Sequence, residues 1–585
     1  MNKVNVLSLA LSLLSISLFS CSTQENNREI IVNFDFDENA LSVEYDNNKN
    51  YLAGDNFTFK INLNENYELN EVIANNEKLV KRPSGEYIFS LIEYENNVVI
   101  TTSKLNNLTI STYEGDTNLN SYYTLWKNRG YPHFKSVGEN NLLVVPLKIK
   151  GYEEYATVEN LKKINDSFFL EDSLNTLGYY SLSEYYKISS YNKLNIKGEV
   201  TPWIDLDLTT KEISSSSISN YTLDCGTYFP TEKAINYIKE NLNIDLTKYD
   251  NDKDGFIDGV YFIYGCPTFL DDSSLSSSTF WNFTYYNVLN KDKASISSPV
   301  LMTYSWSSFD MLSKGSDKTK LDTHTYVHEF GHQLGLNDYY DTSNSGGLNP
   351  YTSPMGGLDM MDNNVGDHSA FSKFALGWVN PYIVKGDYGE VNIDLKSLIS
   401  DGECIILPTK EYNNTPFDEY FMIEYVKNDS INKVDSTTGY PSTFYTDGRI
   451  IRFYSKNGIR ITHIDARSVD SNFNYTDDIN SMMMTKFSNT ASTKEGYYCP
   501  SNHNSYVLTS LISGNASRNT LGTFFVANNQ DLIYEGNTID FYSSSSNSRA
   551  SMIPFSTNRF DDGSVFNYSI KVNSINDTEA SITIF

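Results

Sequence analysis

The sequence predicts a multidomain protein of the α+β class, in which a central α/β domain is flanked by β-sandwich domains. Its 585 residues are too many for one hydrophobic core and indicate roughly three to four domains. Helix-like and strand-like segments alternate over residues 140–387, whereas short strand-like segments with Asn- and Ser-rich connections fill both ends. The content of 39% hydrophobic and 14% aromatic residues is sufficient to build such cores.

Residues 1–21 combine an early lysine with an apolar run that ends at Cys21, and polar residues follow. This pattern predicts an export signal. The LFSC ending is similar to a bacterial lipobox, in which Cys21 becomes the acylated first residue of the mature chain; simple secretion with a cleaved peptide is the alternative. A transmembrane helix is disfavoured, because the run is short and contains five serines. We expect a lipoprotein on the extracellular face of the cell membrane, or a form released to the medium.

Residues 22–105 contain alternating segments such as EIIVNFDF, FTFKINL and YIFSLIEY, which predict a small β-sandwich. Three roles are open for this module: a spacer above a membrane, a binding module, or a pro-segment. We expect residues 106–139 to form a linker.

The α/β domain is expected to span residues 140–387. It opens with NLLVVPLKIKGY, which reads as a buried strand. Two helical stretches follow, VENLKKINDSFF and LSEYYKISS, and then the strand-like KLNIKGEV and the amphipathic TEKAINYIKENL. This alternation indicates α/β structure.

An acidic segment, DNDKDGFID, places carboxylates at positions 1, 3, 5 and 9 of a loop and glycine at position 6. The four acids are Asp250, Asp252, Asp254 and Asp258. Such spacing can wrap oxygen ligands around Ca²⁺, while the glycine permits a sharp turn. Tyr261 stands where an EF-hand has its last glutamate. We expect a structural calcium site; a solvated acidic turn is the alternative.

The segment from His328 to Asp338 reads HEFGHQLGLND, and its spacing suits metal chemistry better than packing. On a helix, His328 and His332 are four residues apart, so their imidazoles project from one face and can share one ion. Glu329 lies about 100° round the helix, where its carboxylate can take a proton from a water without being a ligand. An apolar stripe would bury the helix and hold both histidines: Val327, Phe330 and Leu334.

Gly335 is expected to end this helix, because glycine tolerates positive φ and lets the chain reverse. Asp338, ten residues after His328, can then return to the ion as a third ligand. The alternative is a buried amphipathic helix with two surface histidines. The glycine and the acid favour the metal site, because together they specify a helix and its reversal. Two imidazoles and a carboxylate are ligands of catalytic zinc.

The order of segments around this motif resembles the immune inhibitor A family of secreted bacterial zinc metallopeptidases. The similarity covers about residues 140–467. It is carried by SEYYKISSYNKLNIKGEVTPW (183–203), YDNDKDGFIDGV (249–260), HEFGHQLGLNDYYDT (328–342), DMMD (359–362), GDHSAFSKFALGWVNP (366–381), DEYFMIEY (418–425) and GIRITHIDAR (458–467).

The resemblance implies a metzincin-like fold, in which a methionine turn lies beneath the metal. Met361 is the best match for that methionine, with Met360 and Met355 as alternatives. Family members have an aspartate where most metzincins have a third histidine, which matches Asp338.

Residues 388–585 change to β-type runs such as EVNIDL, YFMIEYV and FNYSIKVNS. They predict a β-rich region whose first part packs on the catalytic domain. Its tail is either a separate module for matrix or glycan, or a region whose tyrosines are ordinary strand aromatics. Three further histidines are expected to be structural: His324, His368 and His463. No CxxC pair occurs among the later cysteines, so zinc–thiolate sites are not expected, and one or two disulfides are open among Cys225, Cys266, Cys404 and Cys499.

The net charge of −28 argues against nucleic acid as a partner, because phosphates would be repelled. We predict a cell-surface or secreted zinc-dependent endopeptidase acting on extracellular proteins or peptides. His328, His332 and Asp338 would hold Zn²⁺, and Glu329 would be the general base. The alternative is an inactive relative that keeps the fold as a surface adhesin or binding lipoprotein. All four positions hold chemically competent side chains, which favours the enzyme.

Overall fold

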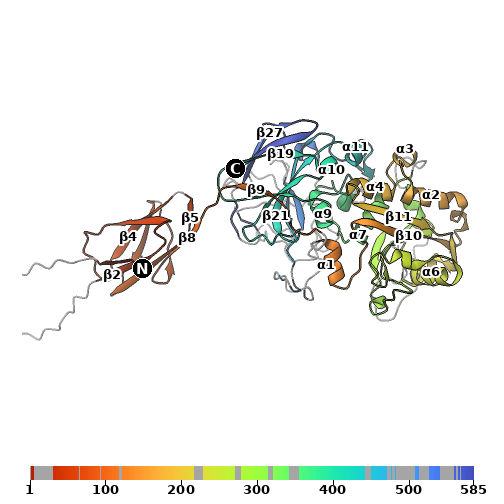
Figure 1. Ribbon diagram of the computed structural model, residues 1–585, viewed down its shortest axis with the longest axis horizontal. Coiled ribbons are helices and arrows are strands. Elements are labelled where there is room, and N and C mark those ends of the chain that lie inside the picture. The colour runs from red at the N-terminus through yellow and green to blue at the C-terminus, as the bar shows by residue number, and fades with distance from the viewer. Residues whose placement is uncertain are drawn as a thin grey trace, which may run out of the picture. The chain divides into compact units, whose positions relative to one another are not determined.

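The computed structural model describes most of the chain in segments. They are residues 2–5, 30–64, 66–82, 84–92, 94–117, 121–215, 228–270, 279–313, 321–340, 355–441, 449–468, 470, 476, 478, 481, 508–512, 526–540, 559–560, 564–566 and 568–585. The chain forms two compact units, Met1–Leu108 with Gly386–Gly389, and Thr109–Lys385 with Glu390–Phe585. Figure 1 labels the main elements of each unit. The described residues form a mixed α/β protein with several sheets and 11 α-helices.

The first unit is a small sandwich of two sheets. One sheet has the strand order β1-β2-β8-β5-β6 and the other β3-β4-β7. The strands are β1 (Asn2–Asn5), β2 (Ile31–Asp35), β3 (Leu41–Tyr45), β4 (Asn56–Leu63), β5 (Tyr67–Ala74), β6 (Glu77–Lys78), β7 (Glu86–Ser90) and β8 (Glu95–Lys104). Alternate residues of both sheets point inward, so Phe34, Phe57 and Phe89 share one buried cluster. β1 lies within the residues that we assigned to the export signal and pairs with β2.

The second unit is built on a mostly parallel sheet with the order β11-β10-β14-β17-β15, in which β12 also pairs with β10. β15 runs antiparallel to β17 at the edge. The strands of this part are β10 (Gly138–Lys150), β11 (Leu194–Val200), β12 (Ile204–Thr209), β13 (Phe256–Ile257), β14 (Val260–Gly265), β15 (Phe283–Tyr286), β16 (Val300–Leu301) and β17 (Thr303–Ser308). β14 is buried along its whole length, as expected for a central parallel strand that is covered on both faces.

Helices cover both faces of this sheet. On β10, Leu142 and Val144 belong to one buried cluster, and Leu143 and Val145 belong to another. The first cluster includes residues of α2, α4 and α7, and the second includes residues of α6. The helical segments are α2 (Val158–Phe169), α3 (Leu174–Leu177), α4 (Leu182–Ser189), α5 (Thr210–Ser215), α6 (Tyr228–Asn241), α7 (His324–Gln333), and the short 3₁₀ turns η1 (Glu153–Tyr155), η2 (Leu246–Tyr249), η3 (Val288–Asn290) and η4 (Phe309–Ser313).

Residues 109–139 belong to the second unit, whereas the sequence suggested a linker over 106–139. β9 (Thr109–Thr112) pairs with β18 (Tyr382–Lys385). In α1 (Tyr122–Asn128), Tyr122 and Trp126 are buried in the main core of the unit. A helix of 7 residues carries too little periodicity to be recognised in a sequence, and its two large aromatic side chains hold it in place.

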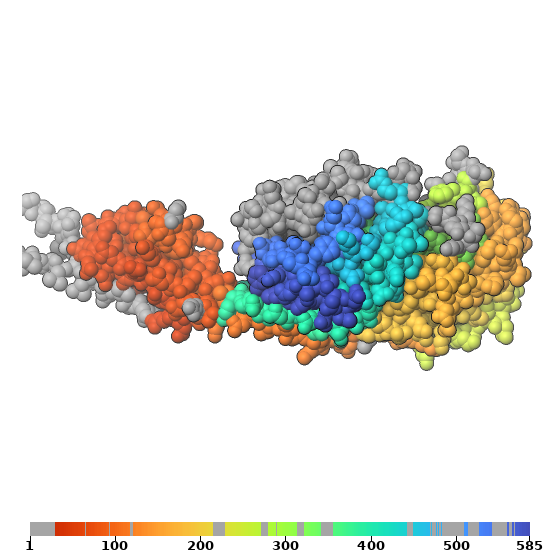
Figure 2. All heavy atoms as spheres, turned by 90° about the horizontal axis from the view of Figure 1, so that it is seen from above, coloured from red at the N-terminus to blue at the C-terminus, as the bar shows by residue number. Residues whose placement is uncertain are grey.

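The C-terminal region from Glu390 onward belongs to the same compact unit as Thr109–Lys385, and only Gly386–Gly389 between them cluster with the first unit. Its main sheet has the order β25-β24-β21-β20-β18-β9, so strands from before and after that residue pair directly. A further sheet has the order β19-β28-β27-β26, and β22 pairs with β23. Figure 2 shows this region, in cyan and blue, packed against the part of the same unit drawn in gold.

The bounds of the C-terminal elements are α8 (Met360–Asn363), α9 (Ala370–Ala375), β19 (Val391–Lys396), α10 (Leu398–Asp401), β20 (Cys404–Pro408), β21 (Glu419–Val426), α11 (Ser430–Thr437), β22 (Tyr440–Pro441), β23 (Ile450–Ile451), β24 (Gly458–Asp465), β25 (Thr509–Ile512), η8 (Asn529–Asp531), β26 (Thr538–Asp540), β27 (Ser569–Ile575) and β28 (Glu579–Ile584). β21 and β24 are buried along their whole length, so they form the core of this part.

Cys266 and Cys404 are free and buried, so neither takes part in a disulfide. Cys21, Cys225 and Cys499 lie outside the described residues. Among the described residues, no helix is both long and apolar enough to span a bilayer.

Candidate metal centre

α7 carries both histidines of the motif and is held rigidly in the core. Val327, Phe330 and Leu334 are fully buried, as the apolar stripe predicted. The backbone of α7 is also fixed from the side, because the Tyr186 hydroxyl on α4 donates a hydrogen bond to the carbonyl of Val327 at 2.7 Å. The helix is therefore a stiff support for its polar face.

Gly335 ends the helix as predicted, with φ +98°. The N–H groups of Gly335 and Leu336 donate to the carbonyls of His332 and Gly331, which is the Schellman arrangement of a helix C-terminus. The Trp126 indole donates to the carbonyl of Gly335 at 2.9 Å. A Cβ at this position would lie 2.5 Å from the Trp126 ring, so only glycine fits.

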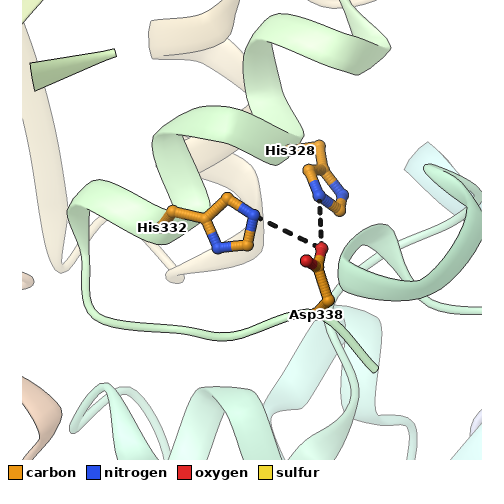
Figure 3. Close-up of side chains that lie close together, drawn as sticks. All are labelled: His328, His332 and Asp338. Atoms are coloured by element: carbon orange, nitrogen blue, oxygen red, sulfur yellow. Dashed lines mark hydrogen bonds and ion pairs between the residues drawn. The ribbon is translucent and has the colours of Figure 1, made fainter. Parts of the chain in front are cut away.

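The reversal brings Asp338 back to the two histidines. Asp338 Oδ1 lies 3.1 Å from His328 Nε2 and 3.4 Å from His332 Nε2. Figure 3 shows that both rings, which are carried by α7, point at this one oxygen of Asp338, which lies on the loop after the helix. The side chain of His328 is 5% exposed, and those of His332 and Asp338 are 18% and 23% exposed. The three residues form a partly open group that could hold a metal ion.

Hydrogen bonds on the far side of each ring fix which nitrogen faces the group. His328 Nδ1 lies 2.7 Å from the carbonyl of Met360, and His332 Nδ1 lies 2.8 Å from the carbonyl of Leu336. A carbonyl only accepts, so each Nδ1 carries the hydrogen and each Nε2 of a neutral ring presents a lone pair. The Nε2 lone pair of a neutral imidazole is the donor that a metal binds. The donor set therefore fits a metal.

The Asp338 carboxylate stabilises positive charge on its imidazole neighbours. Burial lowers the pKa of His332, but the Asp338 carboxylate outweighs it and raises the pKa to about 9. Burial likewise opposes ionisation of Asp338, yet His332 and His328 hold the pKa of this carboxyl well below its usual range. Asp338 is thus an anion at neutral pH.

Glu329 lies beside the group without belonging to it. Its side chain is almost buried, with 7% of the residue exposed, and burial raises its pKa. The Thr284 hydroxyl on β15 lies 3.3 Å from Glu329 Oε2 and donates to the backbone carbonyl of Glu329 at 2.8 Å. Sequence reasoning missed Thr284, because it is separated from Glu329 by 45 residues and no motif marks it.

Met361 packs against α7. A Cβ on Gly331 would lie 2.5 Å from the Met361 sulfur, so this methionine fills the space that glycine leaves. Its carbonyl accepts from the N–H of Tyr339 at 2.8 Å. The backbone carbonyl of Met360 instead accepts the hydrogen bond from the His328 ring. The sulfur of Met355 accepts a hydrogen bond from the Thr509 hydroxyl. Of the three candidates, Met361 is the one whose side chain touches α7 at Gly331.

Tyr340 is a second residue that sequence reasoning missed. Its ring stacks at 28° over that of His328, with centroids 6.4 Å apart. Burial, and then Asp338 and Glu329, raise the pKa of its hydroxyl well above the usual value, so it stays protonated. Its place two residues after Asp338 was the only available signal.

Three further histidines make other contacts. His324 contacts Asp322 and Asp435, and His463 contacts Glu419, as expected of structural histidines. His368 is fully buried among Tyr185, Tyr186 and Trp378. We expected hydrogen bonds to it, but within the described part of the structure neither of its ring nitrogens has a partner.

Three acids of the predicted calcium loop converge: carboxylate oxygens of Asp250, Asp252 and Asp254 lie within 4.8 Å of one another. Gly255 makes the sharp turn with φ +91°. Asp252 also forms an ion pair with Lys127 and accepts from the Tyr123 hydroxyl of α1.

Asp258 is not in this group. Its Oδ2 accepts from the N–H of Asn251, and burial raises its pKa well above the usual range. Burial and the neighbouring Asp252 raise the pKa of Asp254 to about 6. The loop therefore concentrates negative charge that Lys127 offsets in part.

Comparison of the chain with models of known protein families found no match, and comparison with curated proteins found none either.

Proposed function

We propose that the protein is a zinc-dependent endopeptidase. The observation that carries this proposal is the convergence of His328 Nε2, His332 Nε2 and Asp338 Oδ1 on one point, with both Nδ1 atoms tied to carbonyls. Two imidazoles and one carboxylate, with a side of the group left open, are the ligands of a catalytic zinc site rather than a closed structural one. Asp338 and His332 are the more exposed members, so substrate would approach from their side.

When bound, zinc supplies Lewis acidity, which makes water a nucleophile near neutral pH and polarises a carbonyl. The remaining work falls to side chains of the chain itself. Glu329 accepts the proton of the attacking water and returns it to the leaving amine. Burial raises the pKa of Glu329, which suits a group that must both take and give a proton. The Thr284 hydroxyl donates to the backbone carbonyl of Glu329 and so fixes the backbone from which this carboxylate projects.

We also propose that the fold around this site is metzincin-like, as the resemblance to the immune inhibitor A family implies. Three features support this: the parallel strands of the central sheet, the antiparallel edge strand β15 beside α7, and Met361 against Gly331 of the metal-binding helix. We further propose that Asp250, Asp252 and Asp254 bind calcium. A lipid on Cys21 would hold the enzyme at the extracellular face of the membrane.

The proposal is tested by incubating the purified protein with unfolded casein, with and without a zinc chelator. We expect cleavage that stops with chelator and returns when Zn²⁺ is added back. Zinc binding without cleavage of casein or of a random peptide library would instead favour the inactive binding protein. Cleavage that resists removal of all metal would contradict the zinc mechanism.

A further inference from the structure

Asp435 lies on α11, 111 residues after His324, and is fully buried. Its Oδ1 accepts a hydrogen bond from His324 Nε2 at 2.9 Å. Its Oδ2 accepts from the Tyr179 hydroxyl at 3.2 Å and from the N–H of Gly366 at 2.5 Å. A buried carboxylate with three donors is held in one position, and it holds the donors in return.

Two of these donors belong to the segments that frame His328. His324 is the first residue of α7 and lies one turn before His328. Its other ring nitrogen contacts Asp322 at 2.7 Å, and its ring stacks on Tyr179 with centroids 3.6 Å apart. Gly366 follows α8, the helix whose Met360 carbonyl orients the ring of His328.

We propose that Asp435 is a positioning residue for the metal centre. By tying the start of α7 and the segment behind α8 to one carboxylate, it fixes the spacing of the two elements that aim the Nε2 of His328. Asp435 touches neither the ligands nor the reacting atoms, so it acts through His324 and Gly366. The inference rests on the proposed metal site but not on peptidase activity, because ion binding is measured by itself.

The test compares the full-length chain with Asp435→Asn and with a matched control, Asp531→Asn. Asp531 is also a fully buried acid of the C-terminal region, but its carboxylate caps η8. The Zn²⁺ dissociation constant is measured by competition with a chelating dye, well below the melting temperature of every variant. The visible spectrum of the Co²⁺-substituted protein reports the ligand geometry.

We expect Asp435→Asn to weaken zinc binding by about 10- to 100-fold and to change the cobalt spectrum, as for other residues that orient metal ligands. Asp531→Asn should leave both unchanged even if it lowers the melting temperature. Folded Asp435→Asn with zinc affinity within about twofold of wild type would overturn the proposal.

If Asp435→Asn does not fold, two variants of His324 decide. His324→Gln keeps an N–H that can reach Asp435, whereas His324→Leu does not. We expect the leucine variant to lose zinc affinity and the glutamine variant to keep most of it; equal affinities would contradict the positioning role. A wild-type chain that binds zinc but cleaves nothing would count against the peptidase proposal alone.

Discussion

At the scale of single residues, the proposed metal centre depends on the groups that contact the far side of each histidine ring. The carbonyls of Met360 and Leu336 select the tautomer of His328 and His332, and neither carbonyl is a side chain that a motif could specify. Asp338 then supplies the negative charge that makes a cation favourable. The site is therefore set by backbone geometry as much as by the motif.

His324 gives a prediction about pH. Burial lowers its pKa, but Asp322 and Asp435 outweigh burial and raise it to about 10. Tyr179 and Tyr440 pack against the ring and are uncharged at that pH, because burial raises their own pKa values. A raised pKa in the folded state means that the charged histidine stabilises the fold fully below its unfolded pKa of about 6.5.

This stabilisation is lost as pH rises from about 6.5 to about 10. We expect the difference in unfolding free energy between wild type and His324→Gln to be largest at pH 6 and to shrink above it. Urea unfolding of both proteins across this range measures the difference. A difference that stays constant from pH 6 to pH 10 would show that His324 is neutral in the folded protein.

The motif residues were predictable because their spacing encodes one helix face and one reversal. Their supporting residues were not, since Thr284, Tyr186 and Asp435 come from distant elements that only tertiary packing brings near. The expected calcium ligand Asp258 lies outside the group that Asp250, Asp252 and Asp254 form, and its role stays a prediction. Position nine of the loop matches a calcium ligand, and the chain folds so that an oxygen of Asp258 binds the backbone of Asn251.

At the scale of elements, the end of α7 determines whether Asp338 reaches the histidines. Gly335→Ala forces a side chain into a left-handed backbone conformation and against Trp126. Gly536→Ala is the matched control, because Gly536 has φ +81° but nothing lies within 4 Å of its added Cβ. The control should lose about 1 kcal/mol of unfolding free energy, because alanine is strained in the left-handed backbone conformation even where its side chain has space.

We expect Gly335→Ala to lose clearly more than this control, and to bind zinc more weakly because the loop that carries Asp338 is displaced. Chemical unfolding and zinc titration of both variants check this. Equal losses in the two variants would mean that the Trp126 contact does not constrain the turn.

The acidic loop is the second element with a prediction. Millimolar Ca²⁺ should raise the melting temperature of the wild type, and the double change Asp252→Asn with Asp254→Asn should abolish the increase. Lys127→Met should enlarge the increase, because it removes the ammonium that now offsets Asp252. Zinc content should stay the same in all of them. If Ca²⁺ does not change the melting temperature of the wild type, the calcium prediction is wrong and the Lys127 ammonium alone balances the charge of this loop.

At the scale of the whole molecule, residues 109–385 and the C-terminal region form one compact unit. The sequence indicated a boundary at residue 387, because helix-like segments become rare there. The pairing of β18 with β20 crosses this boundary, because β18 ends before residue 387 and β20 begins after it. Strand pairing leaves no periodic trace in a sequence, so only the structure shows that β18 and β20 belong to one sheet.

We therefore expect the fragment 109–387 to be unfolded or aggregated, since it lacks the strands that cover β18 and the α11 residue that binds His324. The fragment 109–585 should unfold cooperatively and bind zinc. Circular dichroism and thermal melting compare the two fragments. A cooperatively folded, zinc-binding 109–387 would show that the C-terminal region is dispensable.

The central claim is that a zinc ion on His328, His332 and Asp338 works with Glu329 as general base. The most direct test measures two properties, zinc content and the rate of casein cleavage. Both are compared among the wild type, Glu329→Gln and Asp338→Ala. Glu329→Gln should retain one zinc per chain and lose at least about 100-fold in kcat, because an amide cannot accept the proton. Asp338→Ala should lose the zinc itself. Cleavage by Glu329→Gln within a few-fold of wild type, or full zinc occupancy of Asp338→Ala at low free metal, would contradict the account.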